Sequence, residues 1–172
     1  MKHGNIIIAL GTAIVLVLSL AGFAVAQEKA SAPEIVKNVQ AAANELSKSG
    51  EAGLADFNKK QPPWVWKDTY IFVLDCTKGV MAAHPIKPEL VGKDVMPIKD
   101  PKGNAFFIQL CGAAKAASGL WVEYWWPKPG EAAGSRKVSY ALKAAGTPYV
   151  VSAGIYDDKA TIADLEKLSG TN

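Results

Sequence analysis

The sequence predicts an α+β domain built on an antiparallel sheet. Apolar residues recur at helical spacing near both ends of the chain and in one internal segment, and five short runs rich in β-branched and aromatic residues lie between these segments. The links between successive strands are of hairpin length, which favours antiparallel pairing over the long crossovers that a parallel sheet requires.

The N-terminal 26 residues have the composition of an export signal. A basic start precedes an uncharged run over residues 6–26 that closes on the small-residue motif Ala-Val-Ala. We therefore predict a signal peptide over residues 1–26 and a periplasmic or secreted domain over residues 27–172. The alternative is an inner-membrane anchor over residues 5–26, since about 20 apolar residues can span a bilayer. In both cases the domain lies outside the cytoplasm.

The 146 residues after this segment suit one domain with one hydrophobic core. They carry 18 basic and 16 acidic side chains, a net charge of +2 that is spread along the chain without a Lys/Arg run. Binding along a phosphate backbone requires clustered positive charge. Nucleic acid is therefore not expected as a partner.

The first helix is predicted to begin at Ser31, where the motif Ser-Ala-Pro-Glu forms a capping box with proline in the first turn. Gly50 ends this helix, and a short helical stretch is expected around residues 54–57. The buried face of the first helix is predicted from its apolar stripe, which consists of Ile35, Val39, Ala42 and Leu46.

A short apolar run over residues 70–74 predicts a buried strand. Residues 80–84 are expected to pair back with it as a hairpin after a turn at residues 75–79. Residues 85–104 contain four prolines and two glycines, and this composition predicts a long ordered loop. Loops of this length inside a domain are often functional.

Asn104 is expected to cap a helix that runs to about residue 117. Three strands are predicted over residues 121–126, 137–142 and 149–156, and Asp157-Asp158 is expected to begin a terminal helix. The N-terminal helix should cover one face of the sheet, and the loop and helix of residues 85–117 should cover the other. A sheet covered by irregular segments is a natural place for a pocket.

Aromatic residues on the strand of residues 121–126 are the first candidates for this pocket. Side chains alternate along a strand, so Val122, Tyr124 and Trp126 share one face. Tyr124 and Trp126 would offer a hydroxyl and an indole N–H on apolar walls. An ordinary aromatic strand, with one side in the core and the other at the surface, explains the alternation equally well.

Lys137 and Tyr140 on the next strand are candidates for recognising an anion. A cation beside tyrosine hydroxyls binds a carboxylate through charge-assisted hydrogen bonds. Taken alone, Lys137 is more simply a solvated strand residue, because lysine is almost never buried without a partner. Alternation also places the two residues on opposite faces, so only a bulge or a position at the pocket rim would bring both to one ligand. His84 either contacts a ligand or caps the long loop.

Cys76 and Cys111 leave two interpretations open. In an oxidising compartment they can form a disulfide between a strand end and a helix, or they can be two buried thiols that never meet, since pairing requires Cα atoms within about 7 Å. The sequence contains no Cys/His cluster, C-x-x-C motif or calcium loop, so we expect no metal and no cofactor. It also lacks a recognisable nucleophile with its base, and we predict no enzyme activity and no catalytic residues.

Several short motifs, taken together in order and spacing, resemble the single Cache domain (sCache_2) of bacterial chemoreceptors and histidine kinases. The resemblance covers about residues 33 to 168. It is carried by Tyr70-Ile-Phe-Val-Leu-Asp, His84-Pro85, Leu90-Val-Gly-Lys-Asp94, Tyr124-Trp-Trp-Pro-Lys-Pro-Gly130, Lys137-Val-Ser-Tyr140 and Gly154-Ile-Tyr156-Asp.

This resemblance implies a PAS-like sheet of about five strands, with the long helix on one face and a loop-helix pocket cover on the other. Pockets of this family take small organic acids, including pyruvate-, lactate- or acetate-like ligands. The family's pocket positions, carried onto this sequence, select His84, Tyr124, Trp126, Lys137 and Tyr140, with Phe107 as a wall.

The expected function is an extracytoplasmic small-molecule sensor module that acts in signal transduction or chemotaxis. Family members usually continue through a membrane helix into a signalling domain, whereas this sequence ends at Asn172. We therefore expect a separate membrane receptor, kinase or transporter as partner. The alternatives are a protein–protein interaction domain with a vestigial pocket and, less favoured, a periplasmic enzyme.

Overall fold

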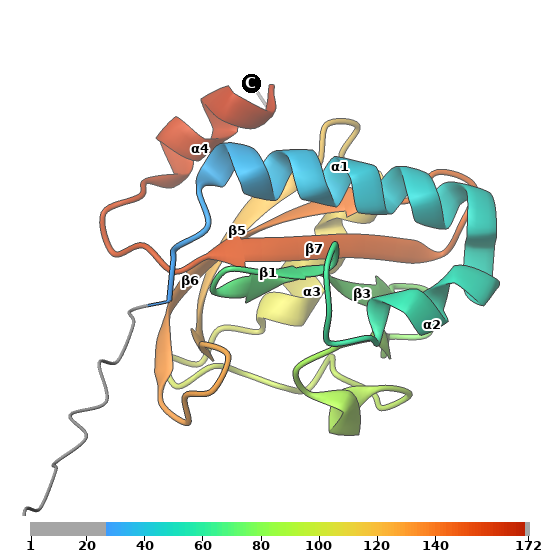
Figure 1. Cartoon of the computed structure of the whole chain (residues 1–172), viewed down its shortest axis with the longest axis horizontal. Helices are drawn as coiled ribbons and strands as arrows, with labels where there is room; N and C mark the ends of the chain where they lie inside the picture. Colours follow the sequence, from blue (N-terminus) through green and yellow to red (C-terminus); the bar gives the residue numbers. More distant parts are fainter. Residues whose placement is uncertain (1–26, 171–172) are drawn as a thin grey trace, which may run out of the picture.

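A five-stranded antiparallel sheet organises the computed structural model, which describes residues 27–170 (Figure 1). The strands follow the spatial order β4-β3-β7-β6-β5, and every neighbouring pair is antiparallel. The predicted fold class is therefore confirmed. The strands are β3 (Phe72–Asp75), β4 (Val80–Ala83), β5 (Leu120–Pro127), β6 (Gly134–Lys143) and β7 (Tyr149–Ile155).

Strand β7 lies at the centre of the sheet, and all of its residues are buried. It pairs with β3 on one side and with β6 on the other, so it joins the β3–β4 hairpin to the β5–β6 hairpin in one sheet. The predicted export segment of residues 1–26 lies outside the described residues. Among the helices of residues 27–170, none is both long and apolar enough to cross a bilayer.

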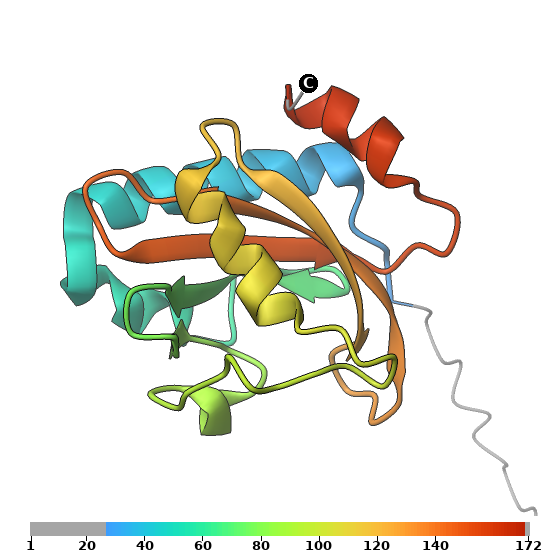
Figure 2. The ribbon, with the colours of Figure 1, turned by 180° about the vertical axis from the view of Figure 1, so that it is seen from behind.

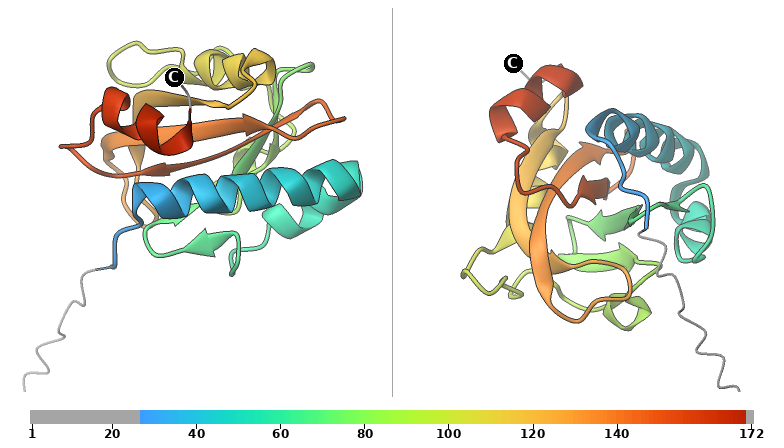
Figure 3. Two further views of the ribbon diagram at one scale, coloured as in Figure 1. Left: turned by 90° about the horizontal axis from the view of Figure 1, so that it is seen from above. Right: turned by 60° about the vertical axis from the view of Figure 1, so that its left-hand side comes forward.

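Helix α1 (Ala32–Ser49) covers one face of the sheet (Figures 1 and 3). It begins as predicted, because the side chains of Ser31 and Glu34 form a reciprocal capping box. It ends at Gly50, whose φ of 57° favours glycine. A 3-10 turn, η1 (Gly50–Gly53), and the short helix α2 (Leu54–Phe57) follow it.

Helix α3 (Phe106–Cys111) and the loop before it cover the opposite face, as seen from behind in Figure 2. The helix is shorter than predicted, since the chain continues as a 3-10 turn, η3 (Gly112–Lys115). Asn104 does not cap it. Instead, the Asn104 side chain donates to the carboxylate of Asp100 at 2.8 Å, and the helix begins two residues later. The loop contains one short 3-10 turn, η2 (Pro88–Leu90).

Two further segments differ from the prediction. Helix α4 (Ile162–Ser169) begins after Thr161, whose hydroxyl accepts the N–H of Asp164, and not at Asp157-Asp158. Asp157 instead accepts the N–H of Lys159 in a turn. A small hairpin of β1 (Val65–Trp66) and β2 (Thr69–Tyr70) was not predicted, because each of its strands is only two residues long.

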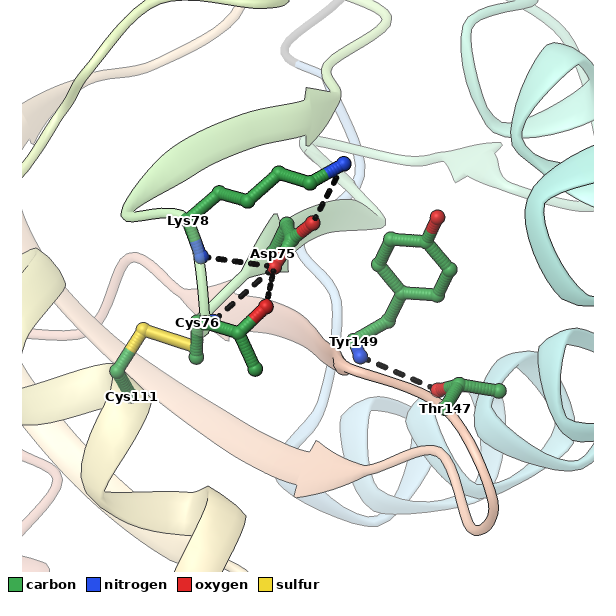
Figure 4. Close-up of a disulfide and its surroundings, with 7 residues drawn as sticks. Asp75, Cys76, Lys78, Cys111, Thr147 and Tyr149 are labelled. Carbon is green, nitrogen blue, oxygen red and sulfur yellow. Dashed lines mark hydrogen bonds and ion pairs between the residues drawn. A yellow bond between two sulfur atoms is a disulfide. The ribbon is translucent and has the colours of Figure 1, made fainter.

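Cys76 and Cys111 form a disulfide that joins the end of β3 to the end of α3 (Figure 4). Their Cα atoms are 5.5 Å apart, which is within the range that pairing requires. The bond spans 35 residues of sequence and closes a loop that contains β4 and the whole segment up to α3. It therefore ties the cover of this sheet face to the sheet itself.

Candidate functional site

Lys137 is the most unusual side chain in the described part of the protein. It lies on β6, is fully buried, and its ammonium has no hydrogen-bond partner among residues 27–170. Three aromatic rings enclose the ammonium: the Nζ atom lies 4.2 Å from the ring centroid of Tyr70, 5.1 Å from that of Tyr156 and 5.4 Å from that of Phe72. The alternative interpretation of Lys137 as a solvated strand residue is therefore wrong.

Burial changes the ionisation of this lysine. Desolvation lowers the pKa of Lys137 to about 7, although the negative charge of Asp68 acts in the opposite direction. Cation–π contacts offset only part of the hydration that a buried ammonium loses. An anionic group placed against Nζ would supply the missing partner.

Trp126 contacts this cluster from β5. Its indole N–H donates to the hydroxyl of Tyr70 at 3.0 Å, and its ring packs edge-on against Phe106 and Phe107 of α3. Phe107 is buried in the same cluster. The sheet, the β1–β2 hairpin and α3 thus meet at these aromatic rings.

Tyr124 lies directly opposite Lys137 in the β5–β6 register and therefore faces the same side of the sheet. Its ring stacks on Phe106 at 4.2 Å between centroids, and its hydroxyl shares a 2.8 Å hydrogen bond with Ser139. Burial raises the pKa of Tyr124, so this phenol stays protonated at neutral pH.

His84 both caps the loop and borders the cluster. Its Nδ1 accepts the backbone N–H groups of Ile86 at 3.3 Å and Lys87 at 2.9 Å. Its ring lies 4.9 Å from that of Tyr70. Burial, assisted by nearby positive charge, lowers the pKa of His84 to about 3, so the ring is neutral at physiological pH. Because Nδ1 is an acceptor, the single ring proton is on Nε2.

Tyr140 lies on the other face of the sheet. Its ring packs against Trp121 at 5.2 Å in the cluster beneath α1, and its hydroxyl donates to the backbone carbonyl of Ser118. The bulge that would be needed to bring it beside Lys137 does not occur, since β5 and β6 pair without a register shift. Five of the six candidate residues therefore meet in one cluster, and Tyr140 does not.

Several residues of the site were not among the candidates. Tyr70, Tyr156 and Phe72 supply the rings around Lys137. Gly154 provides space for the lysine, because a Cβ atom at this position would lie 2.9 Å from Cε of Lys137 and 2.2 Å from Oγ of Ser139. The Gly-Ile-Tyr motif at the end of β7 can be seen in the sequence. Its contact with Lys137 could not be predicted without knowing that β7 pairs with β6.

Asp68 is the carboxylate that acts most directly on Lys137. It lies in the turn of the β1–β2 hairpin, is almost fully buried, and accepts the backbone N–H of Ala30 at 2.8 Å. Asp68 thus binds the backbone just before α1, and its negative charge also acts on Lys137. The described residues contain no group of three or more His, Cys, Asp or Glu side chains that could hold a metal.

Comparison with known proteins agrees with this architecture. The Cache domain family model dCache_2 matches residues 64–161. A methyl-accepting chemotaxis protein, McpP of Pseudomonas putida, is 32% identical over 91 residues, which cover 53% of this chain and 16% of that protein. A sensor histidine kinase, MctS of Rhizobium johnstonii, is 33% identical over 92 residues, which cover 54% of this chain and 20% of that protein. The chain thus matches only a small part of each relative.

Solved structures give the same result for the fold. The periplasmic sensor domain of a chemotaxis protein superimposes with a TM-score of 0.56 at 25% identity, covering 72% of this chain and 88% of that one. A Cache chemosensory domain that recognises carboxylic acids gives a TM-score of 0.55 at 26% identity, covering 72% of this chain and 86% of the other. The family-model match spans more than half of the sequence, and the chain therefore belongs to the Cache domain family of sensor domains.

Proposed function

We propose that this Cache domain binds a small organic acid, such as a pyruvate-, lactate- or acetate-like carboxylate, at Lys137, and that it acts in signal transduction or chemotaxis through a separate receptor, kinase or transporter. The observation that carries the proposal is a fully buried ammonium without a hydrogen-bond partner among residues 27–170. A charge in this position is rare unless it is paired. A bound carboxylate would pair it.

The composition of the site supports one carboxylate on a small ligand. Lys137 is the cation of β6 that is buried on this face. The neighbouring Arg136 is paired with Glu123 and with the carbonyl oxygens of Asp157 and Ala160. Aromatic rings surround the ammonium, and they suit a short apolar or weakly polar tail. A single buried ammonium matches a ligand with a single carboxylate.

The burial of the site implies movement on binding. A ligand reaches the Lys137 ammonium only after part of its cover opens, since the side chain has no exposed surface. The cover consists of the loop and helix of residues 85–117 together with the β1–β2 hairpin. Opening and reclosing of these segments around a ligand is a population shift that a partner protein can detect.

Similar proteins provide independent support. A structural neighbour recognises carboxylic acids, and the curated relatives are a chemotaxis receptor and a sensor kinase. A periplasmic location is inferred from the neighbour that is a periplasmic sensor domain. We infer the same ligand class and signalling context here from the shared fold together with the buried lysine.

A thermal-shift screen tests the proposal. The purified protein is heated with small carboxylates, amino acids, amines or purines, each at several concentrations. A ligand at 100 times its dissociation constant stabilises the native state by about 2.7 kcal/mol, which gives a clear shift of the melting temperature. We expect monocarboxylates alone to produce it.

The matched variant is Lys137→Met, which keeps most of the side-chain volume and removes the charge. It should melt at or above the wild-type temperature and show no carboxylate shift. A shift with purines or amines in the wild type would contradict the proposed ligand class. No shift with any class would favour a protein–protein interaction domain whose pocket is vestigial.

A further inference from the structure

The surroundings of Lys137 leave its charge almost uncompensated. The nearest rings come from the β1–β2 hairpin, β3 and the end of β7, and none of them offers a full negative charge. No ion pair within 4.0 Å involves Lys137 among the residues described, although seven such pairs occur elsewhere in them. The ammonium is therefore enclosed by rings, and among residues 27–170 the charge of Asp68 acts on it without a direct ion pair.

The titratable groups facing this position come from every neighbouring element. They are Asp68 and Tyr70 of the β1–β2 hairpin, Tyr124 of β5, Tyr156 after β7, and His84 after β4, with Lys87 acting on His84 from the loop. Burial raises the pKa of each of the three tyrosines. Because its pKa is about 7, Lys137 changes its ionisation near neutral pH, where His84 is already neutral.

A bound carboxylate would change this balance. An opposite charge at hydrogen-bond distance favours the protonated amine, whereas the enclosed site without ligand favours the neutral amine. The two equilibria are linked, so a ligand that raises the proton affinity of Lys137 must itself bind more tightly when the proton is present. Tight binding and protonation then occur together.

We propose that the site takes up a proton on Lys137 when it binds its carboxylate, so that occupancy responds to ligand concentration and to pH together. This inference rests on the proposed function. The proton comes from the solvent, and the bound state contains one ammonium and one carboxylate in contact. Affinity for the ligand is then constant in acidic solution and falls as the solution becomes alkaline.

Isothermal titration calorimetry of the full chain with pyruvate, and with acetate as a second probe, measures the proton directly. Titrations at pH 8 in phosphate and in Tris, whose ionisation enthalpies differ, give the number of protons exchanged. With a pKa near 7 in the free protein, we expect uptake of about 0.9 proton, and a dissociation constant that rises about hundredfold from pH 6 to pH 9.

Lys137→Arg is the sharpest variant, because arginine keeps the positive charge and does not titrate in this range. Wherever it binds pyruvate, it should do so without proton uptake and with the same affinity at pH 6 and pH 9. If the larger guanidinium prevents folding, the wild-type proton count still decides the question. The ¹³C shift of the Lys137 Cε atom, followed from pH 5 to pH 10 with and without pyruvate, provides a second measurement.

The outcomes separate this inference from the proposed function. Binding with no net proton exchange, and with one affinity from pH 6 to pH 9, would overturn proton-linked binding and leave the carboxylate site intact. Absence of binding by every carboxylate at pH 6 would remove the proposed function and this inference with it. Proton uptake that persists in Lys137→Arg would assign the titration to another group.

Discussion

The two faces of the sheet are built from different chemistry. Beneath α1 the helix contributes only aliphatic side chains to the core, Ile35, Val36, Val39, Ala42, Ala43 and Leu46. The face beneath α3 contains a cluster of stacked and edge-on aromatic rings among its aliphatic side chains, and it also encloses His84 and the ammonium of Lys137. The hydrophobic layer beneath α1 and the layer that contains the Lys137 ammonium therefore lie on opposite faces of the same sheet. The ammonium has no hydrogen-bond partner among residues 27–170.

Strand β6 shows the difference within one segment. Val138 and Tyr140 point toward α1, whereas Lys137 and Ser139 point toward α3. Alternation along a strand makes this division possible without any irregularity in the backbone. One face can then lose stability to a binding function while the other face maintains the fold.

The α1 face should carry the largest share of stability. Leu46→Ala removes a fully buried side chain from the cluster beneath α1 and should lower the free energy of unfolding by about 2–5 kcal/mol. Chemical denaturation measures this change. Leu168→Ala, at a leucine that is 52% exposed, is the control and should change stability by less than about 0.5 kcal/mol. Equal losses of unfolding free energy at Leu46 and Leu168 would contradict the conclusion that the α1 face stabilises the fold.

The disulfide should stabilise the α3 face selectively. Replacing Cys76 and Cys111 together by serine should lower the free energy of unfolding by about 2–5 kcal/mol. Hydrogen exchange should accelerate in α3 and in residues 85–104 more than in α1, because the bond ties only the α3 cover to the sheet. Reduced wild-type protein should match the variant. Uniform acceleration across both faces would show that the bond acts on the whole fold.

Lys137 should make stability depend on pH. Its pKa in the folded protein is about 7 and its ordinary value is 10.5, so between these values the unfolded chain binds more protons than the native state. Stability should therefore rise with pH across this window, by up to about 1.4 kcal/mol per pH unit from this group. Lys137→Met should be more stable than the wild type at pH 7, and the difference should shrink by pH 9. A constant difference would mean that the lysine is not desolvated.

The buried hydrogen bond between Tyr124 and Ser139 should have the smallest effect. Tyr124→Phe removes one partner of a 2.8 Å bond and should lower the free energy of unfolding by about 1 kcal/mol. A double-mutant cycle with Ser139→Ala isolates the interaction, since removing both hydroxyls should be less harmful than the sum of the single changes. Strictly additive losses would show that the two hydroxyls act independently.

Local sequence signals predicted most of the fold. The capping box at Ser31, the apolar stripe of α1 and the strand runs each specify their element over a few neighbouring residues. The errors fall where a tertiary or turn contact decides the outcome. Asn104 bonds to Asp100 instead of capping α3, and Thr161, not Asp157, caps α4.

The site was predictable only in part, for a physical reason. Alternation correctly separated Tyr124 and Trp126 from their neighbours on β5, and it warned that Lys137 and Tyr140 face apart. The burial of Lys137 depends on β7, where Gly154 leaves space for the side chain. That pairing is not visible in the local sequence.

The central claim is that the α3 face, through Lys137, binds a small carboxylate. The most direct test compares the dissociation constants of the wild type, Lys137→Met and Tyr140→Phe for the best carboxylate at pH 6. Tyr140 is the matched control, because it lies on the same strand and faces α1.

Loss of one charge-assisted contact should weaken binding by Lys137→Met at least about tenfold. Tyr140→Phe should stay within about twofold of the wild type. Equal affinity of the wild type and Lys137→Met, or a larger loss in Tyr140→Phe, would contradict the account.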